Sequence, residues 1–220
     1  MILLEPDVAL TDFGLAIECA WLAAWLLWCA VAERSLRRWF VIFFAAVGLG
    51  ALLGGITHGF LSDSQSAIYA VIWSATLIAI GIAGLASGAI GGRLLFSESA
   101  ARRVLIFAGS LFAMYVATVL LISQSFAVAI AYYLPAAAFL LAALVLIYLR
   151  RRRNYLVAGI VGLVLSFVAA AIQQTGTGIL SLGLTHNALY HLIQAVALLL
   201  IFSAALGLTR EVKCQHDATS

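Results

Sequence analysis

The positively charged residues of this chain are confined to four short clusters, and each cluster follows an odd-numbered hydrophobic stretch. All twelve Lys and Arg residues lie in these clusters, at 34–38, 93–103, 150–153 and 210–213. The remaining turns between hydrophobic stretches carry no Lys or Arg. Cytoplasmic loops of membrane proteins are enriched in Lys and Arg. The pattern therefore predicts an all-α membrane protein with seven transmembrane helices, the N-terminus outside and the C-terminus cytoplasmic.

Hydrophobic run length places the individual spans, because a helix needs about 20 mostly apolar residues to cross the hydrocarbon core. The chain has 220 residues, so seven such spans leave room only for short loops. We therefore expect residues 1–220 to form one seven-helix transmembrane domain without a soluble domain. The predicted spans are 13–32, 39–60, 67–90, 104–122, 126–149, 155–171 and 187–208.

Composition narrows the class of protein. Hydrophobic residues make up 65% of the chain and charged residues 10%, whereas a soluble domain averages about 25% charged residues. The net charge of +3 lies in loops beside the membrane, which indicates contact with anionic lipid and no nucleic-acid partner. The only lysine is Lys213, so a retinal Schiff base within the membrane is excluded, and covalent haem is excluded because no CxxCH motif occurs.

Five ionisable residues fall at similar depth near the predicted outer face, namely Glu18, His58, Asp63, His186 and His191. Ionisable groups within a membrane are costly and often functional. Their shared depth predicts a polar site that opens to the outer surface. His58 and His191 are its central residues, although separate packing roles for the two histidines are the alternative.

The last span carries a polar face. Asn187 and His191 are four residues apart and so share one side of the helix, and Gln194 extends that side inward, with Tyr190 nearby in depth. His186 is five residues from His191, which places it about 140° away. We therefore expect Asn187, Tyr190 and Gln194 to bind a cofactor or ligand, and His186 to lie outside the site.

Two carboxylates are candidates for chemistry at this site. Glu18 lies roughly 10 Å into the first span, where a carboxyl group needs a polar partner or a proton. We expect it to pair with His58 or His191, as a third metal ligand or as a general base. Asp63 follows His58 in the outer turn and is the second candidate for the same catalytic role.

Small residues and one proline predict how the helices pack. Gly50 and Gly54, and then Gly84, Gly88 and Gly92, recur at four-residue spacing, which allows helix backbones to approach closely in lipid. Pro135 should kink the fifth span because it removes one backbone hydrogen bond.

The position of His58 late in the second span and the segment HNALYH at the head of the seventh resemble the CREST superfamily. Its members include alkaline ceramidases and adiponectin receptors, in which three histidines hold a zinc ion that activates water for amide or ester hydrolysis. The family's serine position is occupied here by Gly54 and one of its histidine positions by Asn187. The resemblance implies zinc on His58 and His191, with Glu18 or Asp63 completing the site.

Three functions remain open at this stage. The first is a metal-dependent, membrane-embedded hydrolase that acts on a lipid-like amide or ester. The second is a non-catalytic accessory or assembly subunit of a larger membrane complex, and the third is a haem-binding or lipid-binding membrane protein in which His58 and His191 hold the ligand. The chain also resembles bacterial seven-span proteins, so we expect it in the lipid bilayer of a bacterial inner (plasma) membrane.

Overall fold

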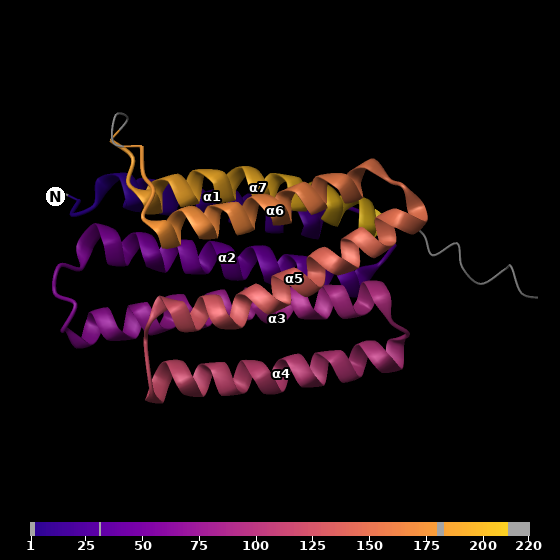
Figure 1. Ribbon diagram of the computed structural model, residues 1–220, viewed down its shortest axis with the longest axis horizontal. Coiled ribbons are helices and arrows are strands. Elements are labelled where there is room, and N and C mark those ends of the chain that lie inside the picture. Colours follow the sequence, from indigo (N-terminus) through magenta and orange to yellow (C-terminus); the bar gives the residue numbers. More distant parts are fainter. Residues whose placement is uncertain (1–2, 31, 180–182, 211–220) are drawn as a thin grey trace, which may run out of the picture.

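The computed structural model describes residues 3–30, 32–179 and 183–210. These residues form seven long helices that lie side by side (Figure 1). Each of these helices is long and apolar enough to cross a membrane, which confirms the predicted all-α fold of an integral membrane protein. The helices are α1 Pro6–Trp28, α2 Arg34–Phe60, α3 Ala67–Leu95, α4 Glu98–Leu121, α5 Phe126–Arg151, α6 Asn154–Thr175 and α7 His186–Arg210.

The first helix differs most from the prediction. It begins at Pro6, not at residue 13, and ends at Trp28, not at residue 32. Proline suits the first turn of a helix because its missing N–H has no partner to bond there. As a consequence, Asp7, Thr11 and Asp12 are helical residues inside the bundle and not part of an external leader.

The two ends of the bundle differ in charge. Every described arginine lies toward the end where α2, α4 and α6 begin, which we call the arginine end. The opposite end, where α1, α3, α5 and α7 begin, we call the cavity end. Figure 1 shows the cavity end on the left and the arginine end on the right.

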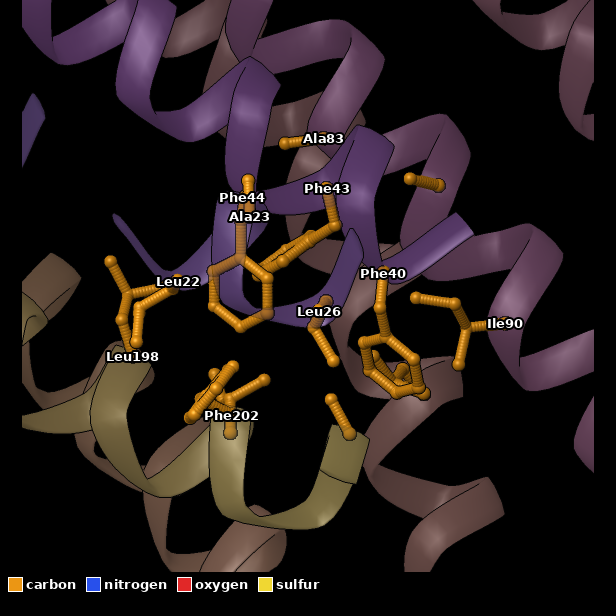
Figure 2. Packing of buried hydrophobic residues seen from close by; sticks show 14 of the residues in the cluster. Leu22, Ala23, Leu26, Phe40, Phe43, Phe44, Ala83, Ile90, Leu198 and Phe202 are labelled. Carbon is orange, nitrogen blue, oxygen red and sulfur yellow. The ribbon is translucent and has the colours of Figure 1, made fainter. Parts of the chain in front are cut away.

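Aromatic and aliphatic side chains from every helix except α4 form the main hydrophobic core, and its phenylalanines come from α2 and α7. Figure 2 shows Phe40, Phe43 and Phe44 of α2 facing Phe202 of α7 and the leucines of α1. The rings of Phe44 and Phe202 meet edge to face, with centroids 5.9 Å apart.

Glycines allow several helices to approach closely, as their spacing predicts. A Cβ atom at Gly162 of α6 would lie 2.6 Å from the carbonyl oxygen of Ala197 in α7. A Cβ at Gly84 would meet Tyr132 of α5 at 2.9 Å, and one at Gly92 would meet Val104 of α4 at 3.0 Å. The four-residue glycine repeat in α3 thus serves packing against α4 and α5.

The fourth helix is peripheral. Among its residues only Ala101, Tyr115 and Val119 are buried, and it packs on α3 and α5 at the edge of the bundle (Figure 1). The neighbouring α5 runs obliquely and remains one helix through Pro135. Its arginine-end half packs on α6, where a Cβ at Gly159 would lie 3.0 Å from Leu144. The other half of α5, toward the cavity end, lines an internal cavity.

Candidate functional site

A cavity of about 230 Å³ occupies the cavity end of the bundle. Six of the described helices line it, all except α4, and it extends from Asn187 in the first turn of α7 to Ala83 in the middle of α3. Apolar side chains form most of its wall. Each of the six helices contributes at least one polar side chain and α7 contributes four, so the cavity has an amphipathic lining.

An acid and a histidine meet on the cavity wall. The carboxylate oxygen Oδ1 of Asp12 in α1 lies 3.2 Å from Nε2 of His191 in α7. The side chain of Asp12 is 4% exposed and that of His191 is 11% exposed. Because both are enclosed, their interaction is shielded from the screening that weakens surface pairs.

Thr11 orients the imidazole of His191. Its hydroxyl oxygen lies 2.8 Å from the carbonyl oxygen of Asp7 and 2.9 Å from that of Val8, so its single proton points to the backbone. The same oxygen is 3.2 Å from Nδ1 of His191 and therefore accepts a hydrogen bond from the ring. That leaves Nε2 facing Asp12, with one proton between the two side chains. The Asp12–His191 pair can thus hold a proton at the cavity wall and exchange it with a bound molecule.

Two glycines of α2 make room for this pair. A Cβ atom at Gly54 would lie 3.2 Å from Oδ2 of Asp12. A Cβ at Gly55 would lie 2.8 Å from the ring of Phe13. Any larger residue at these positions would press on Asp12 or Phe13 of α1, so both glycines have a steric role.

His58 lies at the mouth of the cavity and has a different partner. Its Nδ1 atom is 3.1 Å from Oε2 of Glu5, which precedes α1. The backbone supports this contact, since Leu4 N–H donates to the Gly59 carbonyl and Glu5 N–H donates to the His58 carbonyl. The start of α1 is also hydrogen-bonded to α7, its other neighbour. The Oδ2 atom of Asp7 accepts a hydrogen bond from the N–H of Thr185, the residue before α7.

The predicted polar face of α7 lines the cavity. Asn187, Tyr190, His191 and Gln194 all contribute to its wall together with His58. Thr185 caps α7, since its hydroxyl accepts from the Ala188 N–H, and the helix begins at His186, one residue before the start of the predicted span. The structure therefore brings five of the predicted site residues to one cavity.

Glu18 and Asp63 lie elsewhere. Glu18 is outside the cavity lining, six residues beyond Asp12 on α1, and its Oε1 is buried without a hydrogen-bond partner among the described residues. Six residues turn a helix by about 240°, which rotates Glu18 away from the face that holds Asp12. The expected pairing of Glu18 with His58 or His191 is thus not formed. Asp63 is exposed and accepts from the Gln65 N–H in the turn between α2 and α3.

The donor set does not fit the zinc centre that the CREST resemblance implies. A catalytic zinc site has three protein ligands and an open position. Within the described ranges, no group of three or more His, Cys, Asp or Glu side chains could hold a metal ion. Both ring nitrogens of His191 already have partners, so a zinc ion or a haem iron would have to displace Thr11 or Asp12.

Sequence reasoning missed Glu5, Thr11 and Asp12. The expected start of the first helix at residue 13 placed all three outside the bundle. Pro6 was the available signal, because proline marks a first helical turn. From that start, Val8, Leu15, Cys19 and Leu22 form one buried apolar stripe, which Asp12 interrupts. A carboxyl group within such a stripe would have been a site candidate.

Comparison with known protein families shows to which family the chain belongs. The family of unknown function DUF6962 matches residues 8–210, a range that contains Thr11, Asp12 and all of α7. Comparison with curated proteins and with solved structures gave no match. Because the family match covers nearly the whole chain, the protein belongs to DUF6962.

Proposed function

We propose that this protein is a membrane-embedded binding protein for a small amphipathic molecule. The ligand's polar head group lies beside Asp12, and its apolar part lies against the wall toward Val47 and Ala83. The lining supports this orientation, because its polar residues lie within about three turns of the cavity end, whereas Val47 and Ala83 lie more than three turns from it. Ligand cavities in proteins commonly combine an apolar wall with a few placed polar groups.

The observation that carries the proposal is the incomplete pairing of Asp12. Its Oδ1 contacts His191, but its buried Oδ2 has no hydrogen-bond partner among the described residues. A buried polar atom without a partner costs about 1–3 kcal/mol, more if it is charged. Asp12 is part of the cavity wall, and a rotation of its carboxyl group would bring Oδ2 within reach of a hydrogen-bond donor of the ligand. That contact would remove the cost and so add affinity.

The proposal is tested by filling the cavity. We expect Ala170→Trp, which places an indole in the cavity from α6, to abolish co-purification of the hydrophobic small molecules that the wild-type protein carries. Mass spectrometry of organic extracts of the purified protein measures this. Val168→Trp is the control, because Val168 lies at nearly the same depth of α6 but is 45% exposed on its outer side.

The comparison of the two tryptophan variants decides the outcome. Loss of the same molecules in both variants, or their retention in both, contradicts the proposal. In that case the accessory-subunit hypothesis becomes the better one, and it predicts that other membrane proteins copurify in mild detergent.

We also propose that the cavity end faces the outside of the cell. Arginines at the opposite end support this orientation, since Lys and Arg are retained on the cytoplasmic side. A phosphatase reporter fused after Ser220 is expected to be inactive and a fluorescent reporter at the same position to be active, as for a cytoplasmic C-terminus. Periplasmic phosphatase activity at that position would reverse the orientation and place the cavity mouth in the cytoplasm.

A further inference from the structure

We infer that the cavity selects an amphiphile with an uncharged head group that both donates and accepts hydrogen bonds, such as a vicinal diol. This inference rests on the proposed function and adds the chemical class of the ligand. It follows from which polar groups of the cavity wall already have partners, which do not, and what charge they carry.

Several polar groups of the wall are satisfied within the protein. The Thr76 and Ser166 hydroxyls donate to carbonyl oxygens of their own helices. The Trp73 indole N–H donates to the Gln124 carbonyl. His58 contacts Glu5, and both nitrogens of His191 have partners. These groups have little hydrogen-bonding capacity left for a ligand.

The remaining polar groups come from four helices. They are Oδ2 of Asp12 in α1, the Tyr133 hydroxyl of α5, the N–H groups of the Gln173 amide in α6, and three groups of α7, namely the Asn187 amide, the Tyr190 hydroxyl and the Gln194 amide. None of these groups has a hydrogen-bond partner among the residues that the structure describes. Tyr190 and Gln194 are four residues apart and so share one side of α7. Gln194 is 6% exposed, so its amide faces the protein interior and the cavity.

These groups are best satisfied by a ligand head group that can both donate and accept hydrogen bonds. Hydroxyls of tyrosine donate and accept, an amide offers two donors and one acceptor, and a carboxylate oxygen accepts. A simple ether or ketone would leave the acceptors of the wall unsatisfied. Adjacent hydroxyls on the ligand supply donors and acceptors within the reach of one small cavity.

Charge excludes the ionic alternatives. The described lining contains no lysine or arginine, so an anionic head group would have no counter-charge. Its one carboxyl group, Asp12, shares a proton with His191, so the pair as a whole is neutral and offers a cation no net negative charge. Moving an ion into such a site without a counter-charge is strongly unfavourable.

The test uses four molecules with a ten-carbon chain, three amphiphiles and one alkane, at equal mole fraction in phosphatidylcholine nanodiscs that contain the whole protein. They are monodecanoylglycerol, decanoate, decyltrimethylammonium and decane, and bound molecules are counted by native mass spectrometry. We expect monodecanoylglycerol to bind at least about tenfold more tightly than the others, which is the effect of one well-made polar contact. Equal or tighter binding of decanoate or decyltrimethylammonium overturns this inference but leaves the proposed function standing. No binding of any amphiphile contradicts both.

Two variants test the residues themselves. Gln194→Leu is expected to weaken monodecanoylglycerol binding by about tenfold while the unliganded protein melts at the same or a higher temperature, because no described residue loses a hydrogen bond. Ser166→Ala is the matched control and should leave affinity unchanged, since that hydroxyl is already satisfied by Gly162. Equal losses in the two variants, or a Gln194→Leu protein that binds normally, contradict the assignment.

Discussion

Replacement of His191 by leucine is expected to destabilise the folded protein by about 3 kcal/mol, the cost of removing one partner from a buried acid–base pair. The Asp12 carboxyl would then have no partner for either oxygen, at a position that is 4% exposed. Reversible unfolding in mixed micelles with increasing fractions of denaturing detergent measures the change. His186→Leu, at the first position of α7 and five residues from His191, should have little effect because no described side-chain contact depends on it.

A double-mutant cycle separates the pair from simple loss of packing. Asp12→Leu alone leaves Nε2 of His191 without its partner, whereas Asp12→Leu combined with His191→Leu leaves two apolar side chains in contact. We expect the double variant to be more stable than the sum of the single losses, as for other buried pairs replaced by apolar residues. Additive losses would show that Asp12 and His191 do not interact.

A methyl group at Gly162 is expected to destabilise the bundle by about 2–3 kcal/mol. Its Cβ would lie 2.6 Å from the backbone carbonyl oxygen of Ala197, and a backbone atom cannot rotate aside as a side chain can. The Gly162→Ala variant must therefore separate α6 from α7, at a cost in the upper range of over-packed cores. The same detergent unfolding measurement detects the loss.

Gly109 in α4 supplies the control for this substitution. A Cβ atom there would meet nothing within 4 Å, so Gly109→Ala should be neutral or stabilise the helix by up to about 1 kcal/mol. Similar losses at both positions would mean that the effect of Gly162→Ala does not arise from the contact between α6 and α7.

Structural features that depend on the residues of a single helix were predictable from the sequence. Hydrophobic run length located the seven helices, and the four-residue spacing of Asn187 and His191 identified the face of α7 that lines the cavity. The joint placement of His58 and His191 followed from their depth alone. Each of these predictions depends on one helix at a time, where run length and helical period carry the information.

The pairing within the site was not predictable in the same way. Depth allowed Glu18, His58 and His191 to meet, but rotation of α1 about its own axis decides which carboxyl faces α7. That rotation is set by packing along the whole helix, in which Gly54 and Gly55 admit Asp12 and Phe13. The hydrophobic pattern of α1 does not predict this rotation well, because apolar residues occur on all sides of the helix.

The contacts between α1 and α7 also bear on how the chain is made. The hydrogen bond from Thr185 to Asp7 joins residues 178 positions apart, and the one between Thr11 and His191 joins residues 180 apart. Neither can form until the ribosome has synthesised the last helix, and contacts so distant in sequence close late. Until then Asp12 lies on the side of an incomplete bundle, open to lipid or to an insertion factor. The proposed binding site is therefore complete only once α7 has inserted, and a chain truncated before α7 would leave the Asp12 carboxyl group without its His191 partner.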